Sequence, residues 1–154
     1  MTVSNISRRV FLGGAIASTA LPVLAHAQDN VDPDNQEPTD MRVRFTFSDQ
    51  TMMATLYDSP ASRDFYSMLP LDLTIENYGP NEKIAYLPRK LTEEGSGQFS
   101  NEQPYDLCYF MTWGNLAMFY ADYKYPGLIR LGRFDDGREA LHVEGEFPLR
   151  IEAA

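Results

Sequence analysis

The feature that most constrains the fold is an alternation of apolar and polar residues that recurs between residues 41 and 151. It is clearest over 41–48, where every second residue of MRVRFTFS is apolar. Successive side chains of a strand point to opposite faces, so the pattern predicts a strand with one buried and one wet face. Turn-forming residues at 48–50 precede a second alternating run over 52–56, which predicts a hairpin.

Six further strands are predicted by alternation or by short apolar runs. They are expected over 71–76, 84–87, 107–113, 116–120, 128–134 and 147–151. The runs over 107–113 and 116–120 are apolar at nearly every position, as strands buried on both faces are. About eight strands in so short a chain predict a mainly β fold, a small closed barrel, because closure removes exposed sheet edges.

One short amphipathic helix interrupts the predicted strands. Ser59 can cap it with its hydroxyl group, Pro60 suits the first helical position, and Pro70 ends the run. A second helical turn is expected over 139–142. Residues 92–104 are rich in Gly, Ser, Glu and Gln, which predicts a mobile loop.

The N-terminal segment predicts export. Arg8 and Arg9 precede an apolar stretch over 11–24, and the small residues of 25–27 suit a signal peptidase. This segment resembles a twin-arginine signal peptide, which carries folded proteins across the bacterial inner membrane, with cleavage before Gln28. The apolar stretch falls short of the roughly 20 residues that span a bilayer. We therefore expect a periplasmic or secreted protein without stable membrane association after cleavage.

The charge of the chain disfavours two classes of partner. Residues 28–40, which hold five acidic residues and one aliphatic residue, are predicted to be a disordered acidic linker before a barrel domain over 41–152. The whole chain has 13 basic and 22 acidic residues, a net charge of −9, and cleavage would leave −11. Such a charge repels nucleic acid phosphates and anionic lipid head groups, so we expect neither as a partner.

The cleaved chain would also lack the residues of many enzyme sites. His26 leaves with the signal, so His142 and Cys108 would be the only histidine and cysteine. Zinc, haem and iron–sulfur sites need several such ligands, and we expect no metal and no cofactor. The sequence also has no phosphate-binding glycine loop and no G-x-S-x-G nucleophile elbow.

Three segments carry a resemblance to a known family. They are KIAYLPRKL over 83–91, DLCYFMTWGNLAMFY over 106–120 and GLIRLGRFDDGREAL over 127–141. Together they resemble the bacterial cyclophilin-like domain family, whose members mostly have no established activity. The resemblance implies a cyclophilin-type barrel with an outer groove. The isomerase motifs of true cyclophilins are not found here, so no catalytic residue transfers and the catalytic residues stay unknown.

Arg89 is a weak candidate for a catalytic or ligand-binding residue. It follows Pro88 at the end of a short apolar strand, where its guanidinium could donate to a peptide carbonyl or bind a carboxylate. The alternative is a surface ion pair with Glu82, Glu93 or Glu94. Two further arginines, at 130 and 133, are expected to be solvated or to pair with the acidic residues at 135–136.

The densest aromatic cluster supplies the other ligand-binding candidates, because its rings could receive an apolar group. With Arg89, the candidates are Tyr109, Phe110, Trp113, Asn115, Phe119 and Tyr120. Core packing is the favoured alternative for most of these rings, with Trp113 the exception because it adjoins a turn. For Asn115 we favour a left-handed turn residue over a ligand contact. Loop tyrosines at 105, 123 and 125 are candidates for a groove rim.

The sequence favours a monomeric, non-enzymatic binding module for a small apolar ligand or an extended peptide. One alternative is a weak peptidyl-prolyl cis-trans isomerase, in which an arginine hydrogen-bonds the imide and lowers a barrier of roughly 18–20 kcal/mol. The other is an accessory protein that docks onto a periplasmic redox or transport partner.

Overall fold

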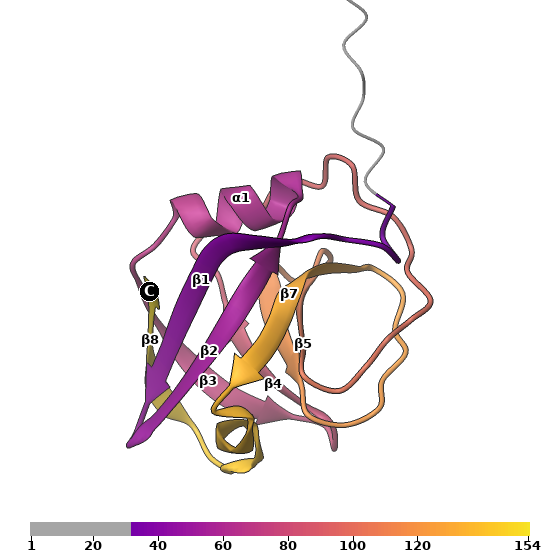
Figure 1. The fold of residues 1–154 in the computed structure, drawn as a ribbon. Helices are drawn as coiled ribbons and strands as arrows, with labels where there is room; N and C mark the ends of the chain where they lie inside the picture. Colours follow the sequence, from indigo (N-terminus) through magenta and orange to yellow (C-terminus); the bar gives the residue numbers. More distant parts are fainter. Residues whose placement is uncertain (1–31) are drawn as a thin grey trace, which may run out of the picture.

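Residues 32–154 form a closed barrel of eight antiparallel strands in the computed structural model, which describes this part of the chain (Figure 1). The strands are β1 (Pro38–Phe47), β2 (Gln50–Tyr57), β3 (Leu71–Tyr78), β4 (Glu82–Tyr86), β5 (Asp106–Phe110), β6 (Asn115–Phe119), β7 (Leu128–Asp136) and β8 (Phe147–Ala153). Their order around the barrel is β1-β2-β7-β5-β6-β4-β3-β8, and β8 pairs with β1 to close it. The predicted closed barrel is confirmed.

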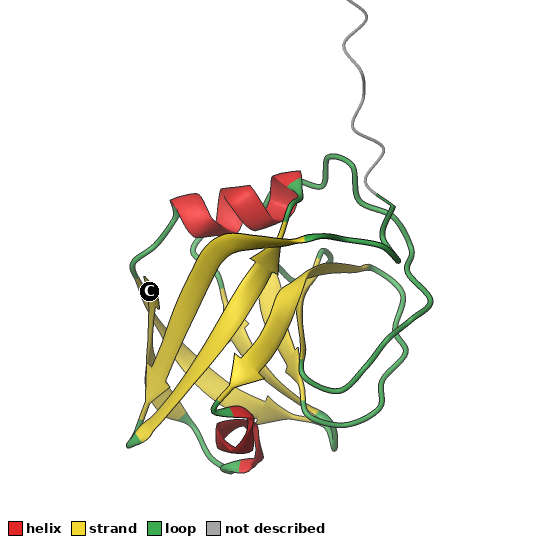
Figure 2. Ribbon diagram, in the orientation of Figure 1, coloured by secondary structure: helices red, strands yellow, loops and turns green. Residues whose placement is uncertain are grey.

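Two helical segments lie at opposite ends of the barrel (Figure 2). These are α1 (Pro60–Ser67) and the 3-10 helix η1 (Arg138–His142). The predicted cap is present, because the Ser59 side chain accepts a hydrogen bond of 3.2 Å from the backbone N–H of Ser62. Phe65 of α1 is fully buried in the core, which fixes the helix on the barrel end. Within residues 32–154, no helix combines the length and apolar character that crossing a bilayer requires.

The two faces of β5 and β6 contribute to different apolar clusters. Leu107 and Tyr109 of β5 point into the barrel core, whereas Cys108 between them belongs to a cluster on the outer face. The buried members of this outer cluster are Phe99, Cys108, Ala117, Phe119, Tyr123 and Leu128. Phe99 comes from the loop over 87–105 and Tyr123 from the loop over 120–127, so both loops fold over the outer face. The prediction that these strands are buried on both faces is confirmed.

A buried carboxylate ties the two strands β5 and β7 together. Asp106 is fully buried and forms ion pairs with Arg133 at 3.2 Å and Arg130 at 3.6 Å. It also accepts a hydrogen bond of 2.7 Å from the Tyr123 hydroxyl. The expectation that these arginines are solvated or pair with 135–136 is wrong, because the antiparallel register places Asp106 directly opposite Arg133.

The ordered structure begins earlier than the predicted domain. Strand β1 starts at Pro38, within the segment expected to be a disordered linker. Before it, Asp34 accepts a hydrogen bond of 2.6 Å from the backbone N–H of Ser100, and the Pro33 carbonyl accepts one of 3.0 Å from Arg130. These hydrogen bonds fix residues 33 and 34 on the barrel, although the segment has too few apolar residues to be held by burial. The predicted signal peptide and the start of the linker lie outside the described residues.

We expect Asp106→Asn to lower the free energy of unfolding by about 3 kcal/mol, because it leaves the guanidinium of Arg130 buried beside a neutral group. Urea denaturation followed by circular dichroism measures the loss. The matched control is Asp72→Asn, which breaks an exposed ion pair of 2.7 Å with Arg150 and should cost less than about 1 kcal/mol. Equal losses in the two variants would contradict the structural role of Asp106.

Candidate functional site

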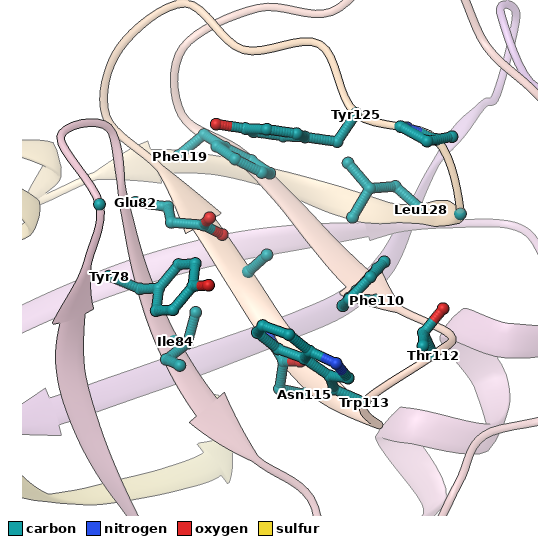
Figure 3. A pocket seen from close by; sticks show the side chains of 14 residues that line it. Tyr78, Glu82, Ile84, Phe110, Thr112, Trp113, Asn115, Phe119, Tyr125 and Leu128 are labelled. Atoms are coloured by element: carbon teal, nitrogen blue, oxygen red, sulfur yellow. The ribbon is translucent and has the colours of Figure 1, made fainter.

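A pocket of about 420 Å³ opens on the outer face of the barrel, over strands β4, β6 and β5 (Figure 3). Five aromatic side chains line it, namely Tyr78, Phe110, Trp113, Phe119 and Tyr125. Ile84, Ala117 and Leu128 add apolar surface. Glu82 is the only charged side chain that the described residues contribute to the lining.

Strand register places these side chains on one face. On β4, Glu82 pairs with Phe119 of β6, and Ile84 pairs with Ala117. Residues two apart in a strand share a face, so these four side chains and Asn115 all point outward. The methyl group of Ala117 lies between bulkier neighbours, which leaves space at the centre of the pocket.

Trp113 forms one wall of the pocket from the turn between β5 and β6. Its ring lies edge-to-face with those of Tyr78, at 5.6 Å, and Phe110, at 5.3 Å, and its side chain is half exposed. We predicted a strand as far as residue 113, but β5 ends at Phe110. The left-handed residue of the turn is Gly114, with φ of +73°, and not Asn115, which begins β6.

Phe119 and Tyr125 form the other wall. The Phe119 ring stacks on Tyr125 at 6.0 Å and on Tyr123 at 3.6 Å. Of the three loop tyrosines expected at a rim, Tyr125 lines the pocket. The Tyr123 side chain instead packs into the outer apolar cluster. The Tyr105 hydroxyl lies 3.3 Å from Nε2 of His142.

Glu82 is a buried carboxylate without a partner. Its residue is only 8% exposed, and no hydrogen bond or ion pair from residues 32–154 reaches its carboxylate. Figure 3 shows the two carboxylate oxygens directed toward the space between the aromatic walls. Removal from water disfavours the charged form and raises the pKa of Glu82 from 4.5 to about 7.

The neighbouring lysine does not neutralise Glu82. Adjacent residues of a strand point to opposite faces, and Lys83 is fully buried on the other side of β4. Its ammonium group donates a hydrogen bond of 2.9 Å to Asn77 and lies 5.8 Å from the centre of the Phe47 ring. Desolvation lowers the pKa of this ammonium group.

Asn115 contributes a second acceptor without a partner. Its side-chain Nδ2 donates a hydrogen bond of 3.1 Å to the carbonyl of Leu116, which fixes the orientation of the amide. Its Oδ1 is buried and has no hydrogen-bond partner among the described residues. Glu82 and Asn115 lie at opposite ends of the pocket, because Glu82 pairs with Phe119, four residues along β6 from Asn115.

The structure brings together four of the seven predicted ligand-binding candidates. Phe110, Trp113, Asn115 and Phe119 line the pocket. They were predicted because they belong to one dense aromatic run, and the hairpin of β5 and β6 gathers them on the outer face.

The other three candidates lie elsewhere. Arg89 forms an exposed ion pair of 2.7 Å with Asp64 of α1, instead of with the predicted glutamates. Tyr109 is fully buried inside the barrel, where its hydroxyl accepts a hydrogen bond from the backbone of Leu91. The Tyr120 ring packs beside that of the solvent-exposed His142, at 5.3 Å.

Sequence reasoning missed the pocket residues Tyr78, Glu82, Ile84 and Leu128. We considered Glu82 only as a partner for Arg89, because the predicted strand began at Ile84. Continuing the period of two back along the chain would have placed Glu82 on the same face as Ile84. No signal in the sequence would have placed Tyr78 or Leu128 there, because their approach depends on the pairing of distant strands.

Comparisons with known proteins support the fold. A family model described as the Cyclophilin-like family matches residues 45–152. The solution structure of a hypothetical protein from Archaeoglobus fulgidus superposes with a TM-score of 0.60 and 18% identity, over 77% of this chain and 98% of that one. This likeness concerns the fold alone. No curated protein matches the chain.

We expect the free energy of unfolding of the wild-type protein to fall as the pH rises from about 4.5 to about 7. The fall is measured relative to the Glu82→Gln variant, which lacks the titrating carboxyl group. In this window the unfolded chain loses the Glu82 proton while the folded protein retains it, so deprotonation favours unfolding. The difference should reach about 3 kcal/mol at most.

Urea denaturation of both proteins at several pH values measures this difference, and the contributions of all other groups cancel in the comparison. Parallel stability curves would show that Glu82 titrates normally.

Proposed function

The chain belongs to the Cyclophilin-like family, and we propose that it is a ligand-binding module that takes a small, mainly apolar ligand on the outer face of its barrel. The observation that carries this proposal is the pocket of about 420 Å³ with five aromatic side chains in its lining. Pockets for small molecules typically measure about 300–1,000 Å³ and combine apolar walls with a few polar groups. Glu82 supplies such a group here.

The geometry favours a small ligand over an extended peptide. A peptide that binds by adding a strand needs a free sheet edge. Every strand of the closed barrel is paired on both sides, so residues 32–154 offer no such edge. A peptide could be held only through its side chains. A compact ligand fits the concave pocket without that restriction.

The geometry does not favour the isomerase alternative. That mechanism assigned Arg89 to the imide of a prolyl peptide, but the guanidinium of Arg89 pairs with Asp64 outside the pocket. No arginine from residues 32–154 lines the pocket. We therefore propose binding without isomerisation.

The neutral dye N-phenyl-1-naphthylamine, whose fluorescence rises in apolar surroundings, tests the proposed binding. We expect the protein to bind it and Trp113→Ala to weaken binding two- to tenfold, because one aromatic contact contributes about 0.5–1.5 kcal/mol. The matched control is Tyr86→Ala. Tyr86 is as exposed as Trp113, at 49% against 48%, but does not line the pocket. If both variants lose affinity for the dye, or if neither does, the dye binds outside this pocket.

We also propose export by the twin-arginine route, from the sequence of residues 1–27. In a bacterial host we expect the wild-type protein in the periplasm as a chain that begins at Gln28. The double substitution Arg8→Lys, Arg9→Lys should retain the longer chain in the cytoplasm. Cell fractionation with intact mass measurement distinguishes the two forms, and an uncleaved cytoplasmic wild-type chain would contradict export.

A further inference from the structure

The pocket holds one acidic side chain and, among the described residues, no basic one. Glu82 is more than nine-tenths buried, its carboxylate faces the pocket, and no described residue bonds to it (Figure 3). No lysine, arginine or histidine from residues 32–154 lines the pocket. A buried charge is costly unless it is paired. No described residue supplies that pairing group, so a ligand that displaces water from the pocket would have to supply it.

Aromatic rings surround the carboxylate. Strand pairing sets Glu82 directly between Tyr78 of β3 and Phe119 of β6, and Tyr125 stacks on Phe119 at 6.0 Å. The electron-rich faces of aromatic rings attract cations, most strongly where water is excluded. A carboxylate among three rings is a favourable site for an organic cation. It is unfavourable for an anion, which would meet a like charge.

Asn115, at the other end of the pocket, adds no positive charge either. The buried Oδ1 of Asn115 has no partner among the described residues and can only accept a hydrogen bond. This Oδ1 is closed off from the open space of the pocket, so recognition of the ligand's polar group rests on Glu82. A protonated amine can donate a charge-assisted hydrogen bond to a carboxylate, which is stronger than a neutral one.

We propose that the ligand is a protonated amine with an apolar body, whose ammonium group pairs with Glu82 while the body lies among the aromatic walls. This inference rests on the proposed function of the same pocket and specifies its ligand class. The titratable groups around Glu82 are the phenols of Tyr78 and Tyr125, which line the pocket, and the thiol of Cys108 on β5, whose pKa is raised by burial. The ammonium of Lys83 lies on the opposite face of β4.

Two ligands of nearly equal size, one cationic and one neutral, test the proposal. These are 2-phenylethylamine, which is protonated at pH 8, and 2-phenylethanol, which is neutral. Each is titrated into the ¹⁵N-labelled full-length chain. The chain has one tryptophan, so a single indole N–H signal reports on the pocket wall.

We expect the amine to bind at least about tenfold more tightly than the alcohol at pH 8, as charge-assisted hydrogen bonds are the stronger ones. Lowering the pH to 5 protonates Glu82 and should weaken the binding of the amine, but not of the alcohol, by about tenfold or more. Glu82→Gln keeps the shape of the side chain and should bring the two affinities within about threefold of each other, consistent with loss of the charged partner. Glu146→Gln, an exposed carboxylate outside the pocket, should leave the preference for the amine intact.

Equal binding of the two ligands to the wild-type protein would overturn the inference and leave the proposed binding function in place. A preference for the amine that survives Glu82→Gln would overturn it as well. If neither ligand shifts the indole signal, the amine inference fails. If the naphthylamine dye also fails to bind, the proposed function fails with it.

Discussion

Closure of the barrel dictates where a ligand can bind. The interior of an eight-stranded barrel of this size is filled by side chains, and Phe45, Phe134 and Tyr109 are among those that occupy it. Strands β5 and β6 are nevertheless apolar on their outer face too. That face must be covered, and the loops over 87–105 and 120–127 cover part of it. The pocket lies on the part of the same face that the loops leave open.

The two buried acidic residues Asp106 and Glu82 differ in whether other residues compensate their charge. Asp106 is surrounded by Arg130, Arg133 and the hydroxyl of Tyr123, so its charge is compensated within the chain. Glu82 has no such partner among the described residues, and burial raises its pKa to about 7. A structural role explains Asp106 fully. It does not explain Glu82, because an uncompensated acid in an apolar pocket lowers stability near neutral pH. The proposed binding role would explain Glu82, because a bound cationic ligand would compensate its charge.

Local patterns predicted the elements, and distant pairing limited the prediction of the site. The alternation over 41–48, the cap at Ser59 and the number of strands were enough to predict a closed barrel with one short helix. Aromatic density identified Phe110, Trp113 and Phe119. The partner of Arg133 was predicted wrongly because only the register of β5 against β7 brings Asp106 opposite to it. Glu82 was overlooked for a local reason, because the predicted strand began at Ile84 whereas β4 begins at Glu82.

Glu82 is an acid in an apolar pocket without a compensating charge from the described residues. Its carboxyl ¹³C chemical shift, followed by NMR between pH 3 and pH 9 and assigned by its loss in Glu82→Gln, tests this claim most directly. We predict a titration midpoint of about 7 in the ligand-free protein. A midpoint close to 4.5, the ordinary value for glutamate, would show that water or a partner compensates the charge, and would contradict this account of the pocket.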